Sequence, residues 1–262
     1  YMNIPLLHLQ GGEVSGNIDN RVRDAISMLA DYHLPCTEKS SRRLVSMGID
    51  PSKIFCVGCP AMDVINHISL SIDNTVYKNN LGLGTPIDFS KPYLLVLQHP
   101  VTTSFGEGLS QIQATLNSLL DFPDYQKLIM WPNIDAGSED IAKGIRLFRE
   151  SNADKTFYFH KNFSPEDYIK VLANAKCLIG NSSSFIREGC FLGIPAVIIG
   201  DRQIGREVSD NVMICDYNSS SITSAVRSQL SRGKYPHDDR YGSGNVSTQI
   251  ADKIYSIFSE CS

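Results

Sequence analysis

The feature that most constrains this fold is a regular alternation of short apolar runs with amphipathic segments. Between residues 93 and 213 most apolar runs of strand length follow a helix-like stretch, and residues 109–120 have helical spacing of their apolar positions. This alternation is typical of βα units that build a parallel sheet, because strands buried on both faces read as continuous apolar runs. The segment has enough strand–helix repeats for a complete doubly wound domain, so we predict an α/β fold.

The predicted elements follow this pattern along the chain. We expect strands at residues 4–9, 32–36, 54–57, 93–98, 127–131, 156–159, 177–179, 196–199 and 212–214. We expect helices at residues 20–30, 109–120, 168–175 and 245–258, each with one apolar face.

A change of composition indicates where the chain divides. Asn, Ser, Gly and Lys dominate residues 66–92, and strand signals vanish there. We expect residues 67–240 to form a C-terminal Rossmann-like domain. Residues 1–66 have too few strands for a covered parallel sheet and read as the remainder of an N-terminal Rossmann-like domain, whose beginning we expect to precede Tyr1. Residues 241–262 are expected to form a helix that crosses back to the first domain.

Charge and cysteine usage exclude several classes of partner. The 262 residues carry a net charge of −4 with dispersed Lys and Arg, so neither a nucleic acid nor a membrane is an expected partner. Seven cysteines without framework spacing fit reduced thiols in the cytoplasm. Cys56 and Cys59 match a redox or zinc pair, but core packing is the favoured interpretation because no second pair lies at a metal-like spacing. We predict no metal site, and no stretch has transmembrane length.

Residues 177–188 outline an anion site. An apolar run leads into a turn of small hydroxyl residues, among them Ser182 and Ser183, and then into a helix. Backbone N–H groups at a helix N-terminus lack intrahelical partners and favour a phosphate, and Glu188 could accept hydrogen bonds from sugar hydroxyls. The alternative is that a serine only N-caps the helix.

Polar residues also follow other predicted strands, where open α/β sheets bind their ligands. His99 ends one strand, although a lone His is more often structural. Asn133 offers a donor and an acceptor for a base edge or a ribose. Arg202 can contact phosphate oxygens with its guanidinium fork, although it could also be an exposed loop cation.

Two carboxylates near the start could carry proton chemistry. Glu13 follows a strand and two glycines, where the backbone can approach a ligand closely. Asp19 lies just before a helix, where a carboxylate is also favoured by the helix dipole alone. The sequence lacks a P-loop, a dinucleotide-binding glycine fingerprint and a nucleophile elbow. Together these observations favour a nucleotide-sugar diphosphate held between two domains and acted on by carboxylates.

Motifs in this order resemble the UDP-N-acetylglucosamine 2-epimerase family, most closely its hydrolysing branch of sialic and legionaminic acid synthesis. The motifs are His8-Leu-Gln-Gly-Gly-Glu13, Gln98-His-Pro-Val-Thr-Thr103, Pro132-Asn-Ile-Asp-Ala-Gly-Ser138, Gly180-Asn-Ser-Ser183 and Arg202-Gln-Ile-Gly-Arg-Glu207. The resemblance implies two Rossmann-like domains of glycosyltransferase-B type, the first incomplete here, with the active site in the cleft. It also implies a homo-oligomer, a dimer or tetramer, that uses no cofactor.

The same resemblance assigns roles to the candidate residues. The UDP-binding set is His99, Asn133, Ser182, Ser183, Glu188 and Arg202, and the catalytic set is Glu13, Asp19 and His99. The implied reaction is anti elimination of UDP from UDP-GlcNAc, or from a related UDP-acetamido sugar, followed by hydration to N-acetylmannosamine or its analogue. It requires a base at C2 and stabilisation of the departing diphosphate.

Three other functions stay open. The non-hydrolysing branch gives UDP-ManNAc, but it typically carries His-Arg-Arg-Glu-Asn where this chain has His99-Pro-Val-Thr-Thr103. A glycosyltransferase of the same fold would use a similar UDP site, yet it needs an acceptor site rather than a C2 base. A catalytically inactive nucleotide-sugar-binding module would bind UDP without turnover.

Overall fold

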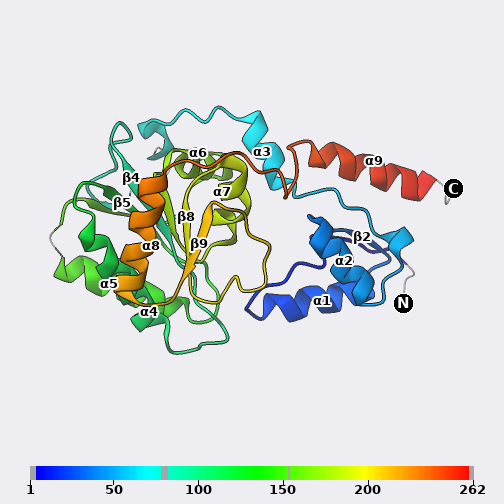
Figure 1. Ribbon diagram of the computed structural model, residues 1–262, viewed down its shortest axis with the longest axis horizontal. Coiled ribbons are helices and arrows are strands. Elements are labelled where there is room, and N and C mark those ends of the chain that lie inside the picture. The colour runs from blue at the N-terminus through cyan, green and yellow to red at the C-terminus, as the bar shows by residue number, and fades with distance from the viewer. Residues whose placement is uncertain (1–3, 78–81, 153, 260–262) are drawn as a thin grey trace. The chain divides into compact units, whose positions relative to one another are not determined.

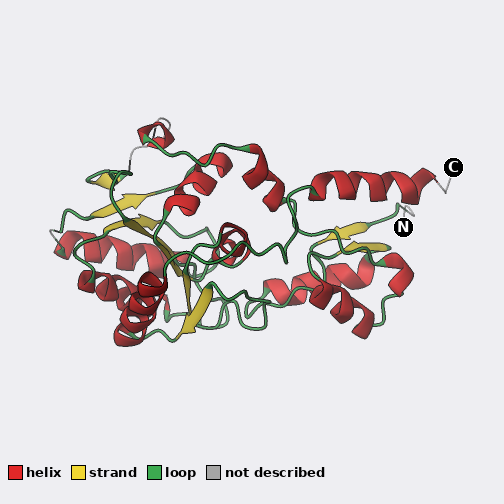
Figure 2. Cartoon of the chain, turned by 45° about the horizontal axis from the view of Figure 1, so that its top comes forward, coloured by secondary structure: helices red, strands yellow, loops and turns green. Residues whose placement is uncertain are grey.

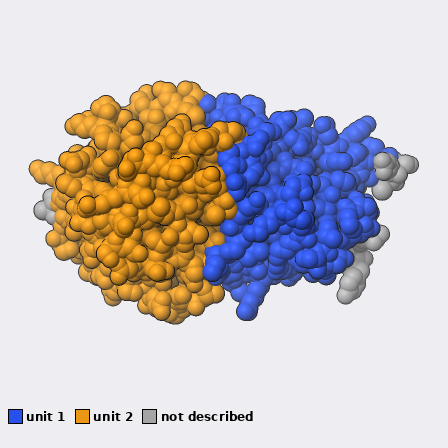
Figure 3. Space-filling model, viewed as in Figure 1, with its two compact units in different colours: residues 1–68, 204–207, 238–262 blue, residues 69–203, 208–237 orange. Residues whose placement is uncertain are grey.

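The computed structural model describes residues 4–77, 82–152 and 154–259. The chain divides into two compact units, each built from more than one segment (Figure 3). Unit 1 comprises Tyr1–Ile68, Ile204–Glu207 and Asp238–Ser262, and unit 2 comprises Ser69–Gln203 and Val208–His237.

Unit 2 contains most of the regular structure (Figure 1). Its strands are β3 (Leu83–Gly84), β4 (Tyr93–Leu97), β5 (Gln126–Met130), β6 (Phe157–His160), β7 (Cys177–Gly180), β8 (Ala196–Ile199) and β9 (Val212–Cys215). Its α-helices are α4 (Gly108–Ser118), α5 (Ser138–Ser151), α6 (Pro165–Asn174), α7 (Arg187–Leu192) and α8 (Ser219–Arg232), and its 3-10 turns are η2 (Asn74–Tyr77), η3 (Leu119–Asp121) and η4 (Ser183–Phe185).

The strands of unit 2 form one sheet in the order β3-β6-β5-β4-β7-β8-β9. All neighbours are parallel except β3, which runs antiparallel to β6. From β4 to β9 this is the doubly wound order, in which the chain reverses direction beside the first strand. Ligands of such sheets bind beyond the carboxyl ends of the strands at that reversal, which here lies between β4 and β7.

Helices cover both faces of this sheet (Figure 2). Helices α4, α5 and α8 lie on one face and α6 and α7 on the other (Figure 1). Every residue of β4 is buried, and its Leu94 and Val96 pack with Ile112 and Leu116 of α4. Burial on both faces explains why the central strands appear in the sequence as unbroken apolar runs.

One detail of the unit 2 sheet differs from the sequence prediction. Strand β3 lies inside the polar segment 66–92, where no strand is predicted, and its two exposed residues gain their pairing only from the edge of β6. Strand β8 is connected to β9 by residues 200–211, which form a loop. The other predicted strands of this unit lie within about two residues of their observed bounds.

Unit 1 is built around a short parallel pair. It contains β1 (Leu7–Leu9), α1 (Asp19–Leu29), β2 (Tyr32–Leu34), α2 (Glu38–Ser46), η1 (Pro51–Lys53), α3 (Ala61–His67) and α9 (Val246–Ser259). Strand β1 pairs with β2, and the strand predicted at residues 54–57 reduces to a single bridge between Ile54 and His33. Leu34, Val57 and Val246 form the core, so the final helix packs within this unit.

Residues 67–68, 204–207 and 238–240 of the predicted domain range 67–240 group with unit 1. For residues 204–207 the ion pair between Arg206 and Glu13 accounts for this grouping. The cysteines within the described residues are free; Cys59 is buried as predicted, whereas Cys56 is exposed. Among the helices that the structure describes, none has the length and apolarity to cross a membrane.

Candidate functional site

A cavity of about 1100 Å³ opens in unit 2 beyond the carboxyl ends of β4, β5 and β7. It is lined by Leu97, His99, Met130, Trp131, Pro132, Asn133, Ile134, Ser138, Glu139, Ala142, Arg146, Lys161, Asn162, Tyr168, Ser182, Ser183, Ser184 and Arg202. The fold therefore brings together all of the predicted UDP-binding residues except Glu188, which is not among the lining residues. The position matches the place where a doubly wound sheet binds its ligand.

His99 is a neutral hydrogen-bond donor at this cavity. Its Nδ1 accepts a hydrogen bond from the backbone N–H of Asn133 at 3.2 Å, so the ring proton is on Nε2. Burial and, secondarily, the nearby Arg202 charge lower the pKa of His99 to about 3. At neutral pH the imidazole can therefore donate from Nε2 but carries no charge.

Arg202, Arg146 and Lys161 bring positive charge to the cavity, and Arg202 is held most firmly by its neighbours. Its side chain is largely buried, and its Nη1 donates to the backbone carbonyl of Asn181 at 3.2 Å. Asp135 lies 3.7 Å from Nη2 and partly balances the charge. A guanidinium held by the backbone on one side of a cavity is suited to an anionic oxygen.

Asn181 is a structural residue of the site that the sequence analysis does not single out. Its Oδ1 accepts from the backbone N–H of His99 at 2.7 Å, and its Nδ2 donates to the His99 carbonyl at 2.9 Å. One side chain thereby joins the end of β7 to the end of β4. The only sequence signal for it was its place in the Gly-Asn-Ser-Ser motif.

The serine turn differs from the predicted helix start. Ser182 caps η4, and α7 begins only at Arg187 and has six residues. The Ser182 Oγ accepts from the Ser184 N–H at 3.4 Å, so this serine caps the 3-10 turn and not α7. Ser182 also lines the cavity, so its hydroxyl, rather than the end of a long helix, is the group available to a ligand.

Glu188 is buried in α7, 4.0 Å from the guanidinium of Arg187. Burial raises the pKa of Tyr168, and the charge of Glu188 contributes to the same shift. Glu188 is not among the residues that line the cavity.

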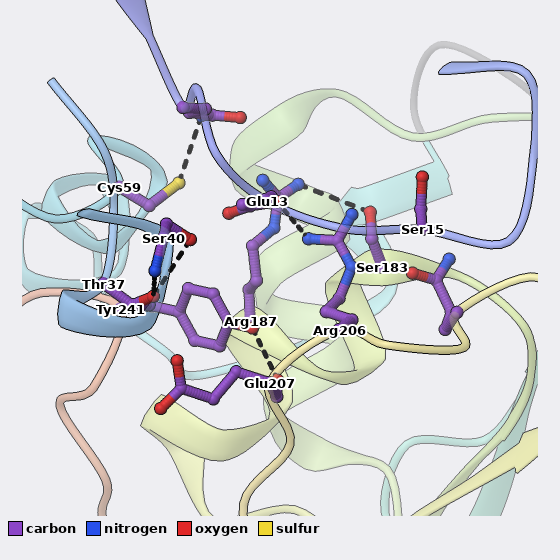
Figure 4. Close-up of polar contacts among 12 residues, drawn as sticks. Glu13, Ser15, Thr37, Ser40, Cys59, Ser183, Arg187, Arg206, Glu207 and Tyr241 are labelled. Carbon is purple, nitrogen blue, oxygen red and sulfur yellow. Dashed lines mark hydrogen bonds and ion pairs between the residues drawn. The ribbon is translucent and has the colours of Figure 1, made fainter. Parts of the chain in front are cut away.

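Glu13 occupies a second, small cavity that lies within unit 1. It follows a turn in which Gly12 has a φ of +78°, a conformation that favours glycine. One carboxylate oxygen pairs with Arg206 (Figure 4), and among the described residues Oε1 has no hydrogen-bond partner although it is buried. The cavity measures about 70 Å³, and its lining includes Lys39 and Arg43.

Asp19 is not brought into either cavity. It is the first residue of α1, and its Oδ2 accepts from the Nδ2 of Asn17 at 2.8 Å. This geometry fits the alternative of a carboxylate in a first helical turn. Beside Glu13 the structure instead places Arg206, which was not among the candidate residues and appears in the sequence analysis only within a motif.

Within the described part of the chain, no group of three His, Cys, Asp or Glu side chains is placed to hold a metal ion. The polar lining of the larger cavity combines hydroxyl and amide groups with the cations Arg146, Lys161 and Arg202 and one carboxylate, Glu139, and its net positive charge suits an oxygen-rich anion.

Known proteins are similar to this chain in sequence. A family model described as UDP-N-acetylglucosamine 2-epimerase matches residues 1–255. A UDP-N,N'-diacetylbacillosamine 2-epimerase (hydrolyzing) of Legionella pneumophila is 34% identical over 98% of this chain and 66% of its own length. A UDP-N-acetylglucosamine 2-epimerase of Neisseria meningitidis is 32% identical over 92% of this chain and 61% of its own length. The chain therefore spans slightly less than two thirds of the length of these relatives.

Solved structures share the fold. The UDP-GlcNAc 2-epimerase of Neisseria meningitidis bound to UDP-GlcNAc superposes with a TM-score of 0.78 at 17% identity, covering 98% of this chain and 71% of that one. The Methanocaldococcus jannaschii enzyme in complex with UDP-GlcNAc and UDP has a TM-score of 0.75 at 17% identity, with 97% and 70% covered. The likeness confirms the predicted α/β class with Rossmann-like domains of glycosyltransferase-B type.

Proposed function

The chain belongs to the UDP-N-acetylglucosamine 2-epimerase family, and we propose from this that it is a hydrolysing 2-epimerase acting on UDP-GlcNAc or a related UDP-acetamido sugar. The observation that carries the proposal is the cavity of unit 2, where Arg202, the Nε2 of His99 and the hydroxyl of Ser182 surround one space. These groups suit a diphosphate that must leave with developing negative charge.

We assign the proton chemistry to Glu13. Removal of the C2 proton needs a carboxylate that is fixed in position and still has an oxygen available. Arg206 fixes one oxygen of Glu13, and the other has no partner among the described residues. Asp19 stays a candidate for the hydration step on the strength of the motif alone.

The hydrolysing branch is favoured by the motifs and by one relative. This chain has His99-Pro-Val-Thr-Thr103 where the non-hydrolysing branch typically has a basic His-Arg-Arg-Glu-Asn run. The Legionella relative carries "hydrolyzing" in its name. The Neisseria relative is nearly as similar and its name leaves the outcome open, so epimerisation without release of UDP is the second candidate.

Incubation of the protein with UDP-GlcNAc in D₂O tests the proposal. A hydrolysing epimerase releases UDP and gives N-acetylmannosamine with deuterium at C2. Epimerisation to UDP-ManNAc with C2 exchange but no free UDP would select the second candidate. A product without deuterium at C2 would exclude both and leave a transferase or a binding module. UDP-N,N'-diacetylbacillosamine as a parallel substrate separates the two sugar classes that the relatives' names indicate.

The remaining predictions concern the whole protein. A homo-oligomeric state and a place in sialic-type acid biosynthesis rest on the motif resemblance, and a cytoplasmic location rests on the cysteine usage. A sedimentation measurement of the purified protein checks the first of these.

A further inference from the structure

Three hydroxyl groups form a short chain along one wall of the large cavity. The hydroxyl of Tyr168 lies 2.5 Å from the Oγ of Ser184, which lies 2.9 Å from the Oγ of Ser182. All three residues line the cavity. Tyr168 comes from α6 and the serines from the turn after β7, so the contact joins two elements of unit 2.

The direction of the hydrogen bonds among these three hydroxyls follows from which groups donate and which accept. The backbone N–H of Ser184 donates to the Ser182 Oγ at 3.4 Å, which uses that oxygen as an acceptor. A phenol is more acidic than an alcohol and is therefore the better donor of the two. If Tyr168 donates to Ser184 and Ser184 donates to Ser182, the hydrogen of Ser182 is left for a group in the cavity.

The surroundings keep Tyr168 in its donor form. Desolvation, with a further contribution from the charge of Glu188, raises the pKa of Tyr168 well above its usual value. The phenol therefore retains its proton at neutral pH. In a chain of hydroxyls each donated bond also strengthens the next one, so the effect reaches Ser182.

We propose that Tyr168 is a positioning residue that sets the hydrogen-bond direction of Ser184 and Ser182, so that Ser182 donates to the diphosphate of the bound nucleotide. This inference rests on the proposed function, because it takes the diphosphate of a UDP-sugar as the ligand. Without the phenol, the Ser182 hydroxyl is free to turn and donate to Ser184. Its oxygen would then face an anion, which is unfavourable.

Binding of UDP and of uridine to the Tyr168→Phe variant, measured by calorimetry, tests this. We expect the UDP dissociation constant to rise about fivefold, as for one hydrogen bond of typical strength, while that of uridine changes less than about twofold. Ser182→Ala should weaken UDP about tenfold. The double variant should be no weaker than Ser182→Ala, because Tyr168 acts through Ser182.

Tyr93→Phe is the matched control. Tyr93 lies in β4, and its hydroxyl donates at 2.5 Å to the carbonyl of Val171 in α6, the helix that also carries Tyr168. Tyr93 is not among the residues that line the cavity. This variant should lose stability and keep the UDP-to-uridine ratio of the wild type. Three results would each overturn the proposal. The ratio of the UDP and uridine dissociation constants could change equally in both tyrosine variants, or the losses of UDP affinity could add in the double variant. The third is a wild-type protein that binds UDP no more tightly than uridine. Absence of C2 exchange with intact UDP binding would instead remove the proposed function alone.

Discussion

Arg206 pairs with one oxygen of the Glu13 carboxylate and leaves the other oxygen without a partner among the described residues. The two residues are 193 positions apart in the chain. The pair is buried, so its geometry is held more firmly than that of a surface ion pair. A fixed carboxylate with one available oxygen is the arrangement that a general base requires.

Glu13→Gln should abolish proton removal while retaining nucleotide binding. General-base catalysis typically contributes at least about 100-fold in rate, so kcat should fall by that factor or more. The UDP dissociation constant should change less than about twofold, because the UDP groups lie in unit 2. The exposed Glu38→Gln is a control of equal charge change. Full activity of Glu13→Gln would remove Glu13 from the mechanism.

His99 should make folding less favourable as the pH falls. The unfolded chain takes up a proton near pH 6.5, whereas the folded ring does so only near pH 3. This contribution to stability is therefore fully present above pH 6.5 and declines between pH 6.5 and 3, by about 2 kcal/mol at pH 5.

The measurement compares urea unfolding of wild type and His99→Asn at pH 7 and pH 5. The variant should lack this part of the pH dependence, while the other histidines contribute equally to both proteins. Nitrogen chemical shifts of the ring should show a proton on Nε2 throughout. A His99 titration near pH 6.5 would contradict the assignment.

Asn181→Ala should destabilise the protein strongly. It leaves the buried N–H and carbonyl of His99 unpaired, and each unpaired group costs about 1–3 kcal/mol, so a loss of about 3 kcal/mol is expected. Asn174→Ala, whose amide donates to exposed carbonyls of Leu70 and Lys170, should cost less than about 1 kcal/mol. Urea unfolding measures both losses. Equal losses in the two variants would show that the link from Asn181 between β4 and β7 contributes little to stability.

Asp63 should stabilise the start of α9 in a pH-dependent manner. Burial opposes its ionisation, but hydrogen bonds from Ser247 and Val246 outweigh that and hold the pKa of the carboxyl below its usual value. The stabilisation is therefore present above pH 3.8 and is lost as the pH falls through the lower folded-state pKa.

Asp63→Asn, which keeps one acceptor, should lose about 1 kcal/mol at pH 7 and progressively less in acid. Thermal unfolding followed by circular dichroism at pH 7 and pH 3 measures the difference between the two proteins. A loss that is equal at both pH values would indicate packing rather than charge.

Local patterns in the sequence determined the elements and most of the candidate residues. The sequence predicted β4 and the candidate residue His99 that follows it. A strand buried on both faces and the end of that strand both leave signals within a few positions. Strand β3 left none, because two exposed residues in a polar segment pair only through the edge of β6.

Only the tertiary structure decided how distant side chains pair and in which state they act. Burial beside Arg202 and a backbone N–H of Asn133 make His99 a neutral donor, and no local pattern encodes either. The pairing of Arg206 with Glu13 and of Tyr168 with Ser184 likewise depends on segments brought together by packing. Sequence periodicity specifies which face of an element is buried, whereas protonation and hydrogen-bond direction depend on neighbours that only the folded chain supplies.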